Sequence, residues 1–292
     1  MELLVSILAL GSTYALLAAG IVIIYKASRV VNFAHGELAI VGAYVFHSAA
    51  FLTGASLTGQ SLLITIAISA AASALFGVII YAALMRRLLG RPAIVAAMVT
   101  IGVALILKAA IVVIWESRSV GIALGRQPVI TFESGGRVTW IDVATVVVCI
   151  AFFAALALFF QYTRLGRQFR GTAENPLLAA QRKVNINRIL AVAWGMAVFS
   201  ATLAGVLFGS RSILSPQSPI IGLSGLTAAM VGGLDSLRGA VFGGLLVAAA
   251  TYITARLISP ALSEAVPFLI LLAVMCWRPW GLFGTVEELN RV

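Results

Sequence analysis

Charged side chains are scarce in this 292-residue chain, making up 10% of its positions against 61% for hydrophobic residues. Soluble domains carry about 25% charged residues and need them to cover their surface. A chain with so few cannot cover itself for water, so the composition excludes a soluble globular protein. At roughly 20 residues per span, the length allows eight or nine helices. We expect an all-α polytopic membrane protein, with residues 1–292 forming one transmembrane domain.

Cysteine and lysine are also rare. Cys149 and Cys276 lie far apart in apolar runs, which supplies neither a disulfide framework nor the spacing of a metal site. Only three lysines occur and none follows a glycine, so the chain lacks the G-x-x-x-x-G-K-[ST] pattern of a P-loop. We therefore expect no bound metal or cofactor. If ATP drives this protein, another chain hydrolyses it.

Basic residues outnumber acidic ones by 20 to 10, and they gather in short loops rather than in a nucleic-acid-binding pattern. The segment 162–188 holds six basic residues and one acid, whereas the three basic and three acidic residues of 116–142 balance. The positive-inside rule places 162–188 in the cytoplasm and 116–140 in the periplasm. It also puts the N-terminus outside and the C-terminus in the cytoplasm, which requires an odd number of crossings.

Nine apolar segments supply these crossings. One of them, 219–234, is short and rich in glycine, so it either crosses as a short helix or re-enters; the odd count favours crossing. The N-terminal segment lacks a basic start, which indicates a retained span rather than a signal peptide. The longer spans are expected at 3–25, 33–52, 62–84, 93–115, 141–161, 189–210, 239–258 and 266–282.

Three polar residues, Asn32, His35 and Glu37, interrupt the apolar N-terminal region. Ionisable residues inside a membrane are costly and usually mark a pathway or a partner. Two structural alternatives exist: Asn32 as a helix N-cap, and an ion pair of Glu37 with Lys26 or Arg29. The His-x-Glu pair lacks the cysteines of a zinc deaminase, so we expect no metal here.

Asn175-Pro176 is a helix-start signal inside the basic segment 162–188, because Asn caps helices and Pro favours the first helical position. A helix over 176–184 is too short to be stable alone. It needs a docking surface, which is either a partner protein or anionic lipid headgroups.

Glycines surround Asp235, Ser236 and Arg238 in the segment 225–244. Short spans interrupted by glycine near polar groups often mark binding sites in transporters, although a local Asp235–Arg238 pair is the simpler interpretation. Residues 32–36 and 235–239 share a polar-x-x-basic-Gly pattern, which indicates an inverted internal repeat.

Four segments together resemble the LivH-type inner-membrane permease subunit of branched-chain amino acid ABC importers and their amide and urea relatives. They are "NFAHGELAIVGAYV" (32–45), "GTAENPLLAAQRKVNINRI" (171–189), "GLTAAMVGGLDSLRGAVFGGLLV" (225–247) and "RPWGLFG" (278–284), in the family's order.

The resemblance implies a non-catalytic permease that works with a second homologous permease, two ATPases that bind ATP and Mg²⁺, and a periplasmic binding protein. It implies a translocation path near Asn32, His35, Glu37, Asp235, Ser236 and Arg238. It also implies ATPase coupling through Thr172, Glu174, Asn175, Pro176, Leu177, Leu178, Ala180 and Arg182. A self-sufficient secondary transporter or channel is the alternative; it would need coupling acids or histidines within the spans.

Overall fold

Long apolar helices build the protein. The computed structural model describes residues 2–53, 60–116, 118–122, 124, 129–131, 137–216 and 220–285. Six helices in these ranges are long and apolar enough to cross a membrane. They are α1 (Glu2–Ser28), α3 (Gln60–Ala83), α4 (Ala93–Trp115), α5 (Trp140–Tyr162), α8 (Ile186–Gly209) and α10 (Leu237–Leu257). The predicted all-α polytopic architecture is confirmed.

Three shorter apolar helices occupy the remaining expected spans: α2 (His35–Leu52), α9 (Ile220–Gly232) and α12 (Val266–Trp277). At 1.5 Å per residue, the 13 residues of α9 extend about 20 Å, less than the roughly 30 Å of a bilayer core. The expected short helix at 219–234 is therefore confirmed. The last helix ends at Trp277, five residues before the predicted end of its span at 282.

The remaining elements are small. A 3-10 turn, η1 (Met85–Leu88), follows α3, and α11 (Pro260–Ser263) precedes α12. Two helices, α6 (Arg164–Glu174) and α7 (Pro176–Gln181), occupy the basic segment 162–188. Strands β1 (Val129–Thr131) and β2 (Arg137–Thr139) pair antiparallel within the predicted periplasmic segment 116–140, much of which lies outside the described residues.

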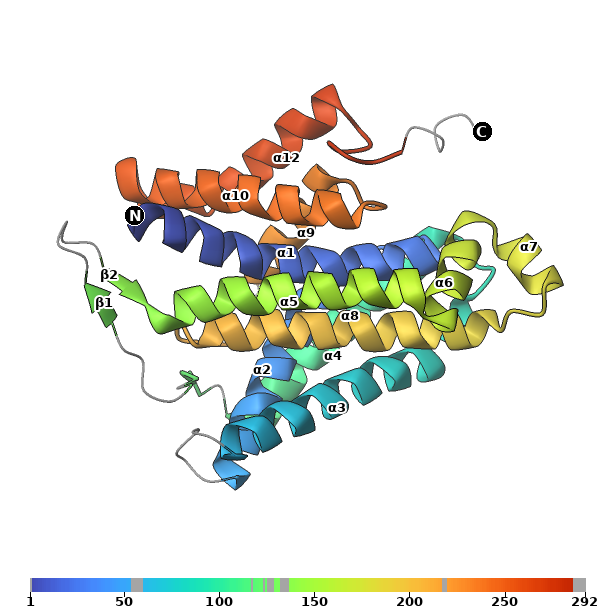
Figure 1. Cartoon of the computed structure of the whole chain (residues 1–292), viewed down its shortest axis with the longest axis horizontal. Helices are drawn as coiled ribbons and strands as arrows, with labels where there is room; N and C mark the ends of the chain where they lie inside the picture. The colour runs from blue at the N-terminus through green and yellow to red at the C-terminus, as the bar shows by residue number, and fades with distance from the viewer. Residues whose placement is uncertain are drawn as a thin grey trace.

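The two halves of the chain pack in the same pattern. Helix α1 packs on α9 and α10, just as α8 packs on α2 and α3, and α2 contacts α4 as α9 contacts α12. Figure 1 shows that α1 ends, and α8 begins, at the end of the molecule where α6 lies. The two corresponding helices, α1 and α8, therefore run in opposite directions. The packing is that of an inverted repeat.

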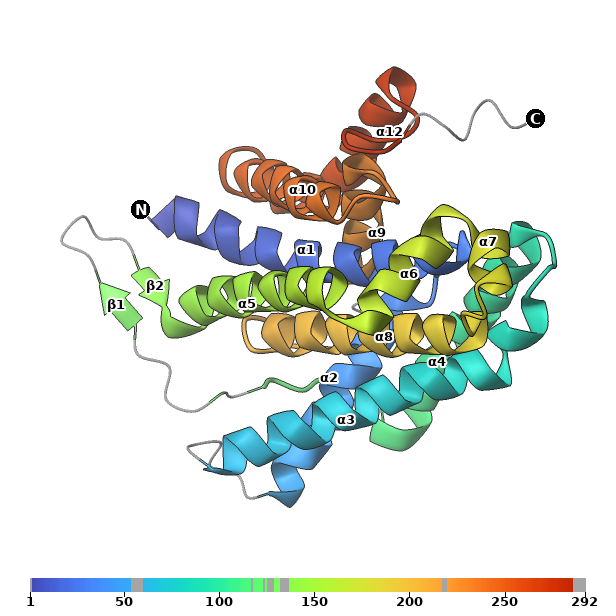
Figure 2. The same cartoon turned by 45° about the vertical axis from the view of Figure 1, so that its right-hand side comes forward.

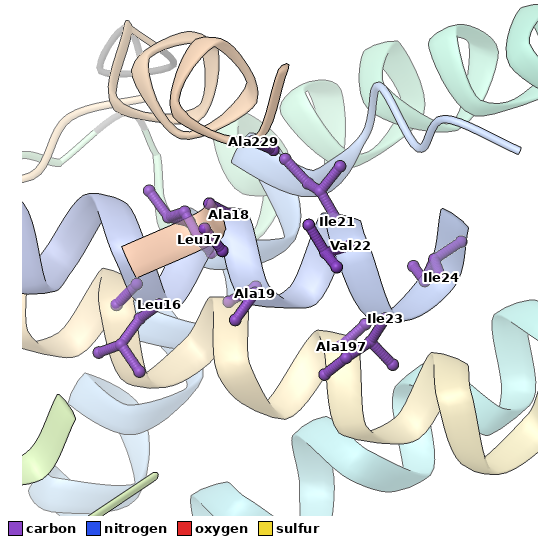
Figure 3. Packing of buried hydrophobic residues seen from close by; sticks show 14 of the residues in the cluster. Leu16, Leu17, Ala18, Ala19, Ile21, Val22, Ile23, Ile24, Ala197 and Ala229 are labelled. Carbon is purple, nitrogen blue, oxygen red and sulfur yellow. The ribbon is translucent and has the colours of Figure 1, made fainter. Parts of the chain in front are cut away.

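Helix α1 forms the centre of the fold. Its most apolar window is 83% buried, against 22% for the windows of α4 and α5. Figure 3 shows Ile23 of α1 beside Ala197 of α8, while Ile21 points away from α8. A helix that is hydrophobic all round is expected to be enclosed by other helices, and α1 is enclosed in this way.

Small residues allow the helices to approach closely. A Cβ added to Gly77 of α3 would lie 2.4 Å from the carbonyl oxygen of Trp194 in α8. Lipid supplies no hydrophobic force between helices, so close backbone packing of this kind holds them together.

Candidate functional site

Helix α2 begins inside the protein rather than at its surface. After α1 ends at Ser28, the chain turns back, and the imidazole of His35 lies against Gly20, where an added Cβ would sit 2.4 Å from its Cε1. Gly20 is eight residues before the end of α1, about 12 Å at 1.5 Å per residue. The first turn of α2 therefore lies well within the thickness of the helix bundle.

The first turn of α9 meets α2 at this level. A Cβ on Gly222 would lie 2.2 Å from the Cα of Gly36, so the two backbones are in direct contact. From this point the helices diverge. The far part of α2 lies beside the end of α4, where Trp115 Nε1 donates to Ser48 Oγ (2.9 Å), whereas α9 ends at the C-terminal segment, where Phe283 N–H donates to the Gly232 carbonyl (2.9 Å).

Two polar side chains are enclosed beside this crossing. Asn32 and His35 are each 1% exposed. Asn32 Oδ1 accepts a hydrogen bond from Ala34 N–H (3.1 Å). Among the described residues, Asn32 Nδ2 and both ring nitrogens of His35 have no hydrogen-bond partner of ordinary geometry, although the backbone of Leu17 lies close to the ring. The N-cap of α2 is Ala34, so the expectation that Asn32 caps this helix is wrong.

A cavity of about 210 Å³ occupies the junction of α2 and α9. Asn32, His35 and Glu37, which the sequence placed in a translocation path, all line it. The structure thus brings these three together, with apolar neighbours from three helices. The remaining lining residues are Ile21, Phe33, Gly36, Gly222, Leu223 and Leu226.

Glu37 has a charged neighbour that sequence reasoning missed. Lys108, in the middle of α4, lies within electrostatic range of Glu37, and neither forms a direct ion pair with another described side chain. The charged group that acts on Glu37 is Lys108, whereas Lys26 lies near Asp235, Arg29 and Glu174, so the alternative that pairs Glu37 with Lys26 or Arg29 is wrong. In the sequence, the only indication of this neighbour was that Lys108 is the one charged residue within the apolar span 93–115.

The other three predicted path residues lie at the junction of α9 and α10. Asp235 accepts hydrogen bonds from the N–H (3.1 Å) and the hydroxyl of Thr285, while Ser236 caps α10 by accepting from Gly239 N–H (3.0 Å). Arg238 is exposed. None of these three lines the cavity at α2, so their role in a path stays a prediction.

The residue match between 32–36 and 235–239 does not follow the repeat. Residues 32–36 lead into α2, whereas 235–239 lead into α10. The packing relates α2 to α9 and α3 to α10. The match therefore joins two elements that do not correspond, although the inverted repeat itself is present.

The basic segment projects from the opposite end of the molecule to the β-hairpin (Figure 2). Asn175 caps α7, its Oδ1 accepting from Leu178 N–H (3.1 Å), and Pro176 takes the first helical position, as predicted. The helix ends at Gln181, earlier than the expected 184. Lys183 adopts a positive φ of 59°, and Val184 N–H donates back to the Ala179 carbonyl (3.1 Å), which closes the helix.

Helix α7 presents leucines to the outside. Leu177 is 78% and Leu178 56% exposed, whereas Ala179 is buried. Ala180, Arg182 and Glu174 are exposed as well, while Thr172 is buried and donates to the Gln168 carbonyl (2.9 Å).

Sequence reasoning missed α6, which supports α7. Its buried residues, Gly166, Phe169 and Thr172, recur every three positions and pack inward, with the Phe169 ring centroid 5.0 Å from that of Phe160 in α5. Thr163 caps it by accepting from Gly166 N–H (2.9 Å). The spacing of these three buried residues could have predicted α6, but the arginines around them made the segment look like a basic loop.

Comparison with known proteins agrees along nearly the whole chain. Residues 3–275 match the family described as the branched-chain amino acid transport system / permease component. BraD, a high-affinity branched-chain amino acid transport system permease protein of Pseudomonas aeruginosa, is 29% identical over 98% of this chain and 96% of its own. LivH of Salmonella typhimurium, which carries the same description, is 30% identical over 95% and 93%.

A more remote relative is a probable branched-chain amino acid transport permease protein of Methanocaldococcus jannaschii, 28% identical over 92% of this chain and 88% of that one. Among solved structures, a chain of PsaBC from Streptococcus pneumoniae in complex with Fab aligns at a TM-score of 0.49 and 13% identity, covering 94% of this chain and 91% of that chain. By its family match and its full-length relatives, the chain belongs to the family of branched-chain amino acid ABC transporter permeases.

Proposed function

We propose that this chain forms the translocation path of a binding-protein-dependent ABC importer for branched-chain amino acids or similar small solutes, using ATP-driven alternating access. The observation that carries the proposal is the α6–α7 unit, which projects exposed leucines from one end of a helix bundle of this family. A permease without a P-loop does not hydrolyse ATP itself, so it needs such a contact through which the conformational change of an ATPase can act on it.

The exposed leucines favour a protein partner for α7 over lipid headgroups. Leu177 and Leu178 are successive residues at the start of a six-residue helix that is capped and closed at both ends. Such a helix holds a fixed shape, and its apolar tip fits a groove. The arginines of α6 remain available for anionic lipid beside it.

The complex we propose contains a second homologous permease, two ATPases that bind ATP and Mg²⁺, and a periplasmic binding protein. This chain binds no cofactor. The positive-inside rule places α6 and α7 in the cytoplasm with the C-terminus, and the N-terminus and β-hairpin in the periplasm of a bacterial inner membrane. The path includes Asn32, His35 and Glu37, which line the cavity.

Co-purification tests this proposal. The chain, tagged at its C-terminus and extracted gently from native membranes, should bring with it an ATPase and a second polytopic chain. A chain that purifies alone and moves leucine across liposomes without ATP would instead be a secondary transporter or channel, and would contradict the proposal.

A further inference from the structure

The polar atoms in the cavity at α2 and α9 point to a ligand. The Ala34 N–H group needs an oxygen acceptor, which fixes Oδ1 of Asn32 on that side and turns Nδ2 away from it. Nδ2 has no hydrogen-bond partner in the part of the chain that the structure describes, although Asn32 is 1% exposed. A buried donor without a partner is costly, so this amide is suited to donate to a group that enters the cavity.

The helix geometry adds positive potential at the same place. The N-cap residue of α2, Ala34, has no side chain that caps the helix, and the first turn of α9 contacts α2 through Gly36 and Gly222. Helix N-termini carry partial positive charge and free N–H groups, and they bind carboxylates. In transporters, helices that begin inside the membrane direct these ends at anionic groups of the substrate.

Glu37, in the first turn of α2, provides the opposite charge in the cavity wall. It is half-buried, and Lys108 on the neighbouring α4 lies within electrostatic range without forming a direct ion pair with it. An acid held inside a membrane protein usually has a functional partner. Its carboxylate accepts a hydrogen bond from its own backbone N–H and has further acceptor positions for an ammonium group.

The other walls are apolar. Ile21 of α1 and Leu223 and Leu226 of α9 face the cavity, whose volume of about 210 Å³ is below the roughly 300–1,000 Å³ of pockets for drug-sized ligands. The site is thus sized for a small solute with one aliphatic group. Leu223 is 44% and Phe33 42% exposed, so the cavity reaches the surface of this subunit.

We propose that this cavity is a solute-recognition site that binds both charged groups of a zwitterion. Asn32 Nδ2 takes the carboxylate beside the positive N-terminal end of α2, Glu37 takes the ammonium, and Ile21, Leu223 and Leu226 contact the aliphatic side chain. The inference rests on the proposed transport function and specifies which groups of the solute the path recognises.

The test measures uptake of L-leucine by the complete complex in proteoliposomes with its binding protein and ATP. Glu37→Gln keeps the shape of the side chain and removes its charge. Asn32→Asp keeps the acceptor for Ala34 N–H but replaces the donor with an anionic oxygen. Glu264→Gln, at an exposed acid next to α11, is the matched control.

We expect the Glu37 and Asn32 variants to take up leucine about tenfold or more slowly, the loss expected for one charge-assisted contact, while the complex still assembles. The control should equal the wild type. Uptake at the control rate by both variants would overturn the site while leaving the transport function intact, whereas a wild-type complex without ATP-dependent uptake would overturn the proposed function.

A second measurement does not depend on those variants. Leu226→Cys, in a complex whose exposed Cys276 is changed to Ser, should react with a small hydrophilic thiol reagent, and L-leucine should protect it. Isoamylamine, which lacks the carboxylate, should protect far less. Equal protection by both compounds, or none by leucine, would contradict recognition of the zwitterion.

Discussion

Gly222 of α9 lies against Gly36 of α2 so closely that a Cβ on Gly222 would sit 2.2 Å from the Gly36 Cα. This contact joins the two halves of the inverted repeat at the point where both short helices begin. It leaves no room for a side chain, and it fixes the position of the cavity beside it.

Replacing Gly222 with Ala should disturb this crossing. Because the added methyl group meets backbone rather than a movable side chain, we expect a loss of about 1–3 kcal/mol in stability, as for other overpacked positions. Thermal unfolding of the detergent-solubilised complex measures this loss. Gly102→Ala in α4 is the matched control, since its Cβ would meet nothing within 4 Å; equal melting temperatures for the two variants would show that the crossing is loose.

Introducing charge at the tip of α7 should uncouple transport. With Leu177 and Leu178 both changed to Asp, we expect normal membrane insertion but loss of leucine uptake and of ATPase binding, because two exposed apolar contacts are removed. Gln181→Asp adds a charge to the same helix without removing a leucine and should transport normally. Unchanged uptake by the double variant would rule out α7 as the coupling element.

The cap of α7 should matter in a graded way. Asn175→Ala removes the acceptor for Leu178 N–H and should cost about 1 kcal/mol of local helix stability. Asn175→Asp keeps an acceptor and should behave like the wild type. Hydrogen exchange at residues 177–181 measures the opening of the helix, and equal exchange in the two variants would contradict this role of the cap.

At the end of the bundle opposite α7, an ion pair joins the start of α5 to the loop after α8. Arg211 Nε lies 2.8 Å from Asp142 Oδ1, with side chains 20% and 10% exposed, and Asp142 also caps α5 together with Thr139. Arg211→Met leaves a mostly buried carboxylate without its cation and should lower stability by about 1–3 kcal/mol.

The exposed pair Arg118–Glu116, at 75% and 69% exposure, is the control for this effect. Arg118→Met should change stability by less than about 1 kcal/mol. If both methionine variants melt together with the wild type, the Asp142–Arg211 pair contributes nothing to the fold.

Apolar runs and caps were predictable because they depend on local chemistry. The nine helical segments, among them the short helix near 219–234, and the Asn175-Pro176 start of α7 follow from composition and spacing. The grouping of Asn32, His35 and Glu37 at one cavity also agrees with their interruption of an apolar region.

Features that depend on tertiary packing were not predictable. The start of α2 beside Gly20 follows from the chain turning back after α1, which no local pattern encodes. In the sequence Lys108 is an isolated charge, and only the packing of α4 on α2 brings it near Glu37. The match of 32–36 with 235–239 paired the wrong elements of the repeat, because a pattern of five residues is too short to identify which helices correspond.

The central claim is that ATP, hydrolysed by partner subunits, drives solute through this chain. Its most direct test is uptake of labelled L-leucine into proteoliposomes that contain the purified complex, with the binding protein outside and ATP supplied to the ATPases. We predict uptake that requires both ATP and the binding protein. Uptake by this chain alone, without ATP, would contradict the account.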